Sequence, residues 1–394
     1  MTVGPPADSI GTSAVTVTVG ALKETAPGET RVAVTPQSVH RFHRHGVTVL
    51  VERDAGAGVL IPDAAYTSAG AIVVDFEELV QRADAVLTVL APARARLEQL
   101  SRGQFLFGLL QARTQPDLVA ALREAGIIAV SLDMLPRTLS SAQSMDALTS
   151  QANVAGYKSI LVAANAYGSY FPMLMTAAGT VRPARVLILG AGVAGLQAIA
   201  TAHRLGAVVS AYDVRPAARA DIESLGASYL DLGLTSADGS GGYARALTTQ
   251  EQHVQQQALA TQIAANDVVI TTAQVPGHKP PLLVTADALA AMHPGSVVVD
   301  LGASELGGNV AGSVPDSTTV TGGGVTIIGA GHLPAAMPQG ASTAYARNIS
   351  DLVQHFIRAG SLCVDLTDEI DGAVVVTAST PHPITHKPTV EAAK

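Results

Sequence analysis

Three glycines between an apolar run and a helical stretch are the strongest chemical signal in the sequence. Gly190, Gly192 and Gly195 form a Gly-x-Gly-x-x-Gly pattern directly after Arg185–Leu189. In such a turn the first glycine permits a tight bend, the second lets a pyrophosphate approach the backbone, and the third lets helix and strand pack closely. The amino end of the following helix attracts the phosphate charge. This context predicts a dinucleotide site rather than a glycine-rich turn without a ligand.

An acidic residue lies where a ribose ligand is expected. Asp213 ends the next apolar run, about 20 residues after the glycines. A carboxylate there accepts hydrogen bonds from ribose hydroxyls and repels a 2′-phosphate, which favours NAD over NADP. Arg215 follows two residues later. We expect it to be a solvated arginine at a helix start rather than a phosphate clamp.

A second polar cluster lies between two series of alternating strands and helices. The segment from Leu135 to Gln151 carries Arg137, Gln143, Asp146 and Thr149. Its residues are candidates to hold the reactive end of the cofactor, because such ends usually lie between domains. The alternative is an ordinary helix start capped by Ser141 or Ser144. On the residues alone both interpretations remain open.

Two further loops are candidates to border the cofactor. The segment 237–247 is rich in glycine and serine and carries Tyr243, so it is either a linker or a lid. The segment 271–281 follows a strand end, where ligands bind in open α/β sheets.

Composition narrows the class of protein. The chain has 394 residues, 48% hydrophobic and 14% charged, which excludes disorder of its bulk. Its net charge of −8 without a basic cluster makes it a poor nucleic-acid binder. The single cysteine, Cys363, rules out an intrachain disulfide or a cysteine-based metal site, and no metal is expected. It also fits a reducing, cytoplasmic compartment.

Neither a membrane span nor a secretory signal is expected. No apolar run approaches the ~20 residues of a membrane helix. Residues 1–14 have no basic region and no apolar core, and are predicted to be a disordered lead-in.

Strand and helix patterns alternate in both halves of the chain, which predicts parallel sheets covered on both faces. The first half has expected strands at Val15–Val19, Val47–Val51, Ala71–Val74, Ala85–Val89, Phe105–Leu110 and Ile127–Ser131, and helices at Pro36–His45, Phe76–Ala83, Ala93–Leu100 and Gln115–Ala125. The second half has expected strands at Arg185–Leu189, Val208–Tyr212, Asp267–Thr272, Ser296–Asp300 and Val325–Ile328.

The region 145–176, between the two halves of the chain, is predicted to be helical without a strand. A final helix is expected at Ser342–Arg358. The predicted fold is α/β, with two Rossmann-like, doubly wound domains flanking a cofactor cleft. The first would comprise residues 15–143 with 342–394, and the dinucleotide-binding domain residues 144–341.

Several segments together resemble the soluble NAD(H)-binding component of proton-translocating NAD(P) transhydrogenase. The resemblance runs from about Val19 to Ile357, and its most specific parts are QSMDAL from Gln143 and the long block from Ala177 to Ala207. The segment from Gly20 to Pro36 is shared with alanine dehydrogenases.

This resemblance implies roles for individual residues. Arg137, Gln143 and Asp146 would hold the nicotinamide and its ribose as the catalytic group, with Thr149 where the family has a serine. The same loop would add the cofactor contacts Thr138, Leu139, Ser144 and Met145. The pyrophosphate would contact Ala191, Gly192 and Val193, which lie between Gly190 and Gly195. The adenosine ribose would contact Asp213, Val214 and Arg215. The remaining contacts would come from Gly242, Tyr243, Ala273 and Gln274. One departure is that the stretch between Arg137 and Gln143 is one residue longer than the family spacing.

The resemblance also implies partners. NADP(H) would be bound by a partner subunit, and membrane-embedded subunits would couple hydride transfer to proton translocation. The chain would be a homodimer, cytoplasmic and peripheral to the inner membrane through those partners, without inserting into it.

Two other functions compete with this one. An alanine dehydrogenase-like oxidoreductase needs a cation for the substrate carboxylate and a general acid–base. Its family lysine and histidine would correspond to Leu90 and Leu110 here, and only Arg31 remains. The other alternative is a non-catalytic NAD-binding protein, which the lengthened Arg137–Gln143 stretch would favour.

Overall fold

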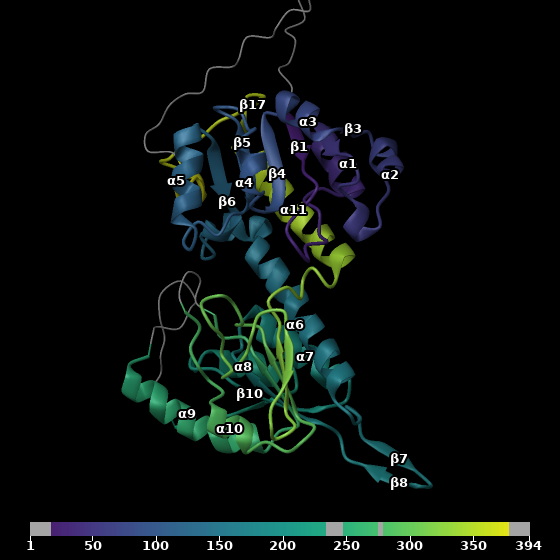
Figure 1. Cartoon of the computed structure of the whole chain (residues 1–394), viewed down its shortest axis with the longest axis vertical. Helices are drawn as coiled ribbons and strands as arrows, with labels where there is room; N and C mark the ends of the chain where they lie inside the picture. Colours follow the sequence, from purple (N-terminus) through teal and green to yellow (C-terminus); the bar gives the residue numbers. More distant parts are fainter. Residues whose placement is uncertain (1–16, 234–246, 275–278, 378–394) are drawn as a thin grey trace, which may run out of the picture.

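The computed structural model describes residues 17–233, 247–274 and 279–377. The predicted lead-in of residues 1–14, the loop with Gly242 and Tyr243, and the end of the tail lie outside these residues. Two sheets, one from each half of the chain, form separate α/β units (Figure 1).

The first sheet has six parallel strands in the order β3-β2-β1-β4-β5-β6. Alternate residues of its strands enter two separate clusters, so both faces are buried. The strands are β1 Thr18–Ala21, β2 Thr48–Glu52, β3 Ile72–Val74, β4 Ala85–Leu90, β5 Phe105–Leu109 and β6 Ile128–Ser131. The helices of this half are α1 Pro36–Arg44, α2 Asp63–Ser68, α3 Phe76–Arg82, α4 Arg94–Leu97 and α5 Pro116–Ala125.

The second sheet is mixed. Six strands run parallel in the order β11-β10-β9-β12-β13-β15, and β14 pairs antiparallel with β15 at one edge. The expectation of a purely parallel sheet was wrong at this edge, because the exposed run Thr318–Val320 has no apolar alternation to mark it. The strands are β9 Arg185–Leu189, β10 Val208–Tyr212, β11 Ser228–Tyr229, β12 Val268–Thr271, β13 Val297–Asp300, β14 Thr318–Val320 and β15 Thr326–Gly329. The helices are α7 Val193–Arg204, α8 Ala218–Ser224, α9 Thr249–Ala264 and α10 Ala286–Ala290.

Two long helices connect the two units. Helix α6 (Ala147–Ala166) packs against α7 of the second unit, and Figure 1 shows it extending from one unit to the other. Helix α11 (Pro338–Phe356) packs its buried face, including Tyr345 and Phe356, into the core of the first sheet. The return of this helix to the first unit was predicted, but it begins four residues earlier than expected, because Pro338 is well suited to the first helical position.

Short elements account for the other departures. The region 145–176 does contain a strand, β7 (Leu174–Thr176), which forms a hairpin with β8 (Gly179–Val181) projecting from the second unit (Figure 1). Exposed hairpin residues have no face to bury, so the sequence shows no period there. The described chain closes with the pair β16 Ile357–Arg358 and β17 Ser361–Leu362, and with α12 Asp371–Val374. Short 3-10 helices occur at 57–59, 132–134 and 140–145.

The contact between α6 and α7 depends on a glycine. A Cβ added at Gly156 would lie 2.1 Å from the backbone oxygen of Ala194, in the first turn of α7. We expect Gly156→Ala to lower the free energy of unfolding by about 1–3 kcal/mol, because the helices would have to separate.

Gly340 supplies the matched control for this substitution. It is exposed in helix α11 with nothing within 4 Å of an added Cβ. Gly340→Ala should therefore be neutral or stabilise by up to about 1 kcal/mol. Urea unfolding followed by circular dichroism measures both, and equal midpoints for the two variants would contradict the close contact.

Candidate functional site

The glycine-rich turn has the geometry that its sequence predicts. Gly190 has φ +101°, and a Cβ on Gly195 would lie 1.9 Å from the Gly190 oxygen, so both positions require glycine. Gly192 differs, because a Cβ there would meet nothing within 4 Å. The exposed Gly192 directly precedes α7, and no side chain caps this helix. The turn therefore fits a pyrophosphate, whose approach to the backbone and to the free amide groups is open.

Asp213 is tied to this turn. It is buried at the end of β10, and its Oδ2 accepts a hydrogen bond from the Ala191 amide at 2.8 Å. Arg215 donates to the same carboxylate from Nε and its backbone amide, both to Oδ1 at 2.9 Å, and from Nη2 to Oδ2 at 3.0 Å. The expectation of a solvated Arg215 was wrong, because the short loop before α8 folds the guanidinium back onto Asp213. A ribose hydroxyl must share or replace these bonds.

The loop after β12 lies beside the turn. Strands β9 and β12 are neighbours, so Thr272, Ala273 and Gln274 emerge next to Gly190 at the carboxyl edge of the sheet. The Thr272 hydroxyl donates to the Gly190 oxygen at 3.0 Å. This is the edge where ligands bind in open α/β sheets. Residues 275–278 of this loop lie outside the described part of the chain.

The polar loop before α6 brings together three of its candidates. Asp146 caps α6 by accepting from the Thr149 amide at 2.8 Å, and its Oδ2 accepts from the Thr149 hydroxyl at 2.6 Å. Arg137 donates to Asp146 at 3.2 Å and to Thr149 Oγ1 at 2.9 Å. The helix cap is therefore Asp146, not Ser141 or Ser144. Despite the lengthened stretch before Gln143, Arg137 is held in this network.

Gln143 is arranged differently from its neighbours. It is exposed in the 3-10 turn Ser140–Met145, and in the described structure its side chain has no hydrogen-bond partner. Its backbone oxygen accepts from the Asp146 amide at 3.3 Å, while Asn348 of α11 donates to the Ser144 oxygen at 2.8 Å. The backbone around Gln143 is thus fixed and its amide group is free. Among the other candidates of this loop, Thr138 and Ser144 are exposed, Leu139 is half-buried and Met145 is buried.

Sequence reasoning missed the supports behind these groups. Gly156 lets α6 approach the start of α7, Thr272 braces the glycine turn, and Asn348 anchors the loop from a helix about 200 residues away in the chain. A glycine inside a long helix is a signal of close packing that could have indicated Gly156. Nothing in the sequence points to Asn348.

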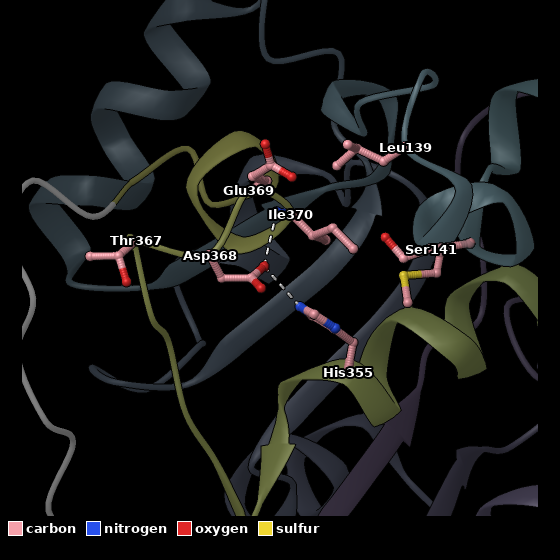
Figure 2. Close-up of a pocket in the computed structure, with 8 residues that line it drawn as sticks. Leu139, Ser141, His355, Thr367, Asp368, Glu369 and Ile370 are labelled. Carbon is pink, nitrogen blue, oxygen red and sulfur yellow. Dashed lines mark hydrogen bonds and ion pairs between the residues drawn. The ribbon is translucent and has the colours of Figure 1, made fainter.

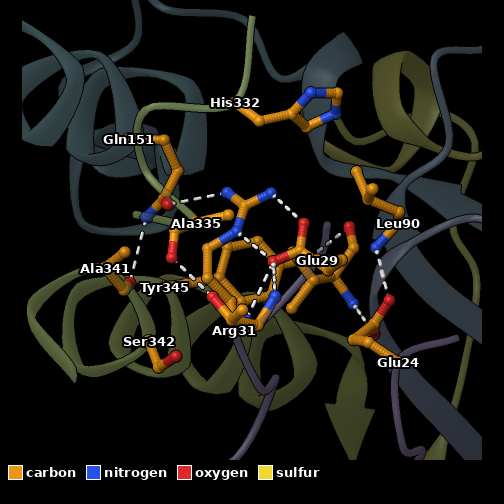
Figure 3. A network of polar contacts seen from close by, with 12 residues as sticks. Glu24, Glu29, Arg31, Leu90, Gln151, His332, Ala335, Ala341, Ser342 and Tyr345 are labelled. Atoms are coloured by element: carbon orange, nitrogen blue, oxygen red, sulfur yellow. Dashed lines mark hydrogen bonds and ion pairs between the residues drawn. The ribbon is translucent and has the colours of Figure 1, made fainter. Parts of the chain in front are cut away.

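A third polar network surrounds Arg31 (Figure 3). The buried guanidinium donates to both Glu29 oxygens, from Nε at 2.8 Å and Nη2 at 2.6 Å, and to Gln151 Oε1 at 2.8 Å. Gln151 in turn donates to the Ala341 oxygen at 3.1 Å, which links α6 to α11. The charge of Arg31 is therefore neutralised by Glu29, and its guanidinium links Glu29 to Gln151 of α6. Leu90 and Leu110 supply no charge nearby.

Glu24 lies in the same network and should make stability depend on pH. Its carboxylate accepts from the Val89 amide at 2.6 Å and the Thr88 hydroxyl at 2.8 Å, yet burial raises its pKa from 4.5 to about 7. A carboxyl whose pKa is higher in the folded state binds more protons when folded. Its contribution to the free energy of unfolding should fall as pH rises from about 4.5 to 7, and stay low above 7.

Glu24→Gln tests this dependence, because glutamine cannot ionise. Subtracting its stability–pH profile from that of the unmodified chain, both from urea unfolding, should leave a slope between about pH 5 and 7. Glu98→Gln, at an exposed residue, is the control and should leave the profile unchanged. Parallel profiles for Glu24→Gln and the unmodified chain would contradict the raised pKa.

None of the helices in the described residues combines the length and apolar composition needed to cross a bilayer.

Comparison with known proteins identifies relatives over nearly the whole chain. Residues 20–155 match the family "Alanine dehydrogenase/PNT, N-terminal domain" and residues 159–383 match "Alanine dehydrogenase/PNT, C-terminal domain". The NAD(P) transhydrogenase subunit alpha of Cereibacter sphaeroides is 43% identical over 90% of this chain, which spans 66% of that protein. An NAD(P) transhydrogenase subunit alpha polypeptide of Rhodospirillum rubrum is 40% identical, over 91% of this chain and 97% of the relative. A crystal structure of transhydrogenase from Sinorhizobium meliloti is 39% identical, with a TM-score of 0.82, over 91% of this chain and 97% of that one.

Proposed function

Because the chain belongs to the alanine dehydrogenase/PNT family, and within it to the NAD(P) transhydrogenase alpha subunits, we propose that it binds NAD(H) for direct hydride transfer to or from NADP(H) on a partner subunit. The observation that carries the cofactor site is the turn itself. Gly192 leaves its backbone open at the start of α7, and Asp213 lies against the same turn. The bound nicotinamide supplies the hydride chemistry, so the chain needs no catalytic acid or base of its own.

The residues of the chain divide this work. The turn Gly190–Gly195 and the amino end of α7 would hold the pyrophosphate, and Asp213, with Val214 and Arg215, the adenosine ribose. Gln143, with its free amide, would orient the nicotinamide. Asp146 and Thr149 hold Arg137 beside this loop, which makes Arg137 a further candidate to contact that end of the cofactor.

The Arg31 network argues against an alanine dehydrogenase activity. A substrate carboxylate would need a free cation, whereas each of the three side-chain nitrogens of Arg31 already donates to Glu29 or Gln151. The positions expected for a lysine and a histidine are leucines, of which Leu110 is buried. Alanine-dependent reduction of NAD by this chain would refute the proposal, and hydride exchange with an NADP(H)-bearing partner is its direct test.

Partners and location follow from the same proposal. Membrane-embedded subunits, including the one that binds NADP(H), would couple hydride transfer to proton translocation, with this chain peripheral to the inner membrane on its cytoplasmic side. We also propose a homodimer. The β7–β8 hairpin supports it, since Met173, Met175 and Val181 are exposed apolar residues on a projecting element.

Asp213 should set the preference for NADH. We expect Asp213→Asn to weaken NADH binding by about 2 kcal/mol, or roughly 30-fold, because charge-assisted hydrogen bonds to the ribose are lost. The same change should narrow the gap between NADH and NADPH. Fluorescence titration with each nucleotide measures both effects.

Asp221→Asn is the control for this titration, since Asp221 is exposed on α8. Its affinities should match those of the unmodified chain. Equal affinity of the unmodified chain for NADH and NADPH would show that Asp213 does not select the cofactor.

A further inference from the structure

Three potential metal ligands meet behind the loop that carries Gln143. His355, at the end of α11, lies within ion-pair distance of Asp368, which precedes α12, and of Asp371, the first residue of α12. Figure 2 shows His355 and Asp368 in contact with each other, and both side chains line a pocket that Ser141 also lines. The volume of this pocket is about 360 Å³. Glu369 and Ile370 line the same pocket.

The geometry of the three groups suits one ion. His355 Nε2 lies 2.9 Å from Asp371 Oδ1 and 3.2 Å from Asp368 Oδ1, and all three ligand atoms lie within 4.8 Å of one another. Two ligands of a tetrahedral zinc ion, each bound at about 2.0–2.2 Å, are separated by about 3.4 Å. Small shifts of these side chains would therefore admit an ion between them.

Hydrogen bonding leaves one of these atoms unsatisfied. The Asp371 side chain is fully buried, and its Oδ1 has no hydrogen-bond partner. Carboxylates only accept, and Nε2 of an imidazole carries at most one proton, which in this arrangement serves Asp368. Asp368 Oδ1 already accepts from the Ile370 amide at 2.9 Å and the Asp371 amide at 3.0 Å. A cation facing the cluster would therefore take the place of the His355 proton at Asp368 and give Asp371 Oδ1 the partner that it lacks.

Charge around the cluster also favours a cation. Asp365, Asp368, Asp371 and Glu369 place four carboxylates in this region. Among the described residues, one guanidinium forms ion pairs with these carboxylates. It is that of Arg358, which lies 3.2 Å from Asp371 and 3.6 Å from Asp365. His355 and Asp368 line the pocket, so an ion and its remaining water ligands would reach the site from there, with the buried Asp371 behind them.

We propose that His355, Asp368 and Asp371 form a binding site for a divalent transition-metal ion, with Zn²⁺ as the preferred cation. One imidazole with two carboxylates is a donor set for such an ion rather than for Mg²⁺ or Ca²⁺, which take oxygen ligands. His355 lies 13 residues from Asp368 and on a different element, so no spacing in the sequence marks the site.

Zinc titration of the chelator-treated full chain tests the site. Isothermal titration and competition with a chromophoric chelator should give one tight Zn²⁺ per chain, bound more tightly than Mg²⁺ or Ca²⁺. His355→Gln and Asp368→Asn should each weaken it by about 100-fold, since even outer-shell changes at metal sites cost about 10–100-fold. Asp371→Asn should do the same, and the first two variants decide the matter if this buried change prevents folding.

Asp316→Asn is the matched control. It breaks another histidine–carboxylate pair, between His332 and Asp316, outside the cluster. Its zinc affinity should equal that of the unmodified chain. Absence of tight zinc binding, unchanged affinity in His355→Gln and Asp368→Asn, or a preference for Ca²⁺ or Mg²⁺ would overturn the proposal.

Discussion

Shortening Gln143 to asparagine is expected to slow hydride transfer about 100-fold while changing NADH binding little, because a misplacement of reacting atoms by about 1 Å can cost that much in rate. Gln143 is exposed, and its side chain has no partner in the described structure. The surrounding backbone is held by Asn348 and Asp146 rather than by the Gln143 side chain. Removing one methylene therefore withdraws the amide group without disturbing the loop.

The measurement separates binding from transfer. NADH affinity comes from fluorescence titration, and the hydride-transfer rate from stopped-flow mixing with the NADP(H)-binding component. Gln339→Asn, at an exposed position at the start of α11, is the control and should leave both values unchanged. If Gln143→Asn leaves the transfer rate unchanged, this loop does not hold the nicotinamide.

Mixing this chain with the NADP(H)-binding component is expected to produce rapid hydride exchange, whereas this chain alone should show none above background. Two nicotinamides must meet, and the described structure offers one dinucleotide turn. The first sheet has a similar strand order, but β1 runs into Leu22 and Lys23 rather than into a glycine turn and a helix. It therefore has no helix amino end there to receive a second pyrophosphate.

Steady-state reduction of an NAD analogue by NADPH measures this exchange, with the two components mixed and each alone. Asp213→Asn in the mixture provides the internal control. If its rate is slower and a higher concentration of the NAD analogue restores it, the lost activity belongs to the dinucleotide site of this chain. Full activity of the chain by itself would refute the proposed division between two subunits.

Local regularity explains which parts of the fold could be predicted. Parallel strands such as β9 and β4 are continuous apolar runs because both faces are buried, and this leaves a direct trace in the sequence. The predicted start of α1 at Pro36 was likewise confirmed, and Thr35 caps this helix by accepting from the Ser38 amide. The β7–β8 hairpin and β14 leave no such trace, because their residues are largely exposed.

The sequence by itself determined the glycine turn and its acid, since these groups are positioned by backbone conformation and by the adjacent strand β10. Tertiary structure alone decided what those groups contact. Arg215 turns onto Asp213, Arg31 is neutralised by Glu29 and donates to Gln151, and His355 meets Asp368 and Asp371. The Arg215 contact depends on the loop before α8, whereas Gln151 is brought to Arg31 by α6 and His355 to its two carboxylates by α11. A side chain's charge can be read from its type, but whether that charge is free for chemistry depends on the neighbour that packing places against it.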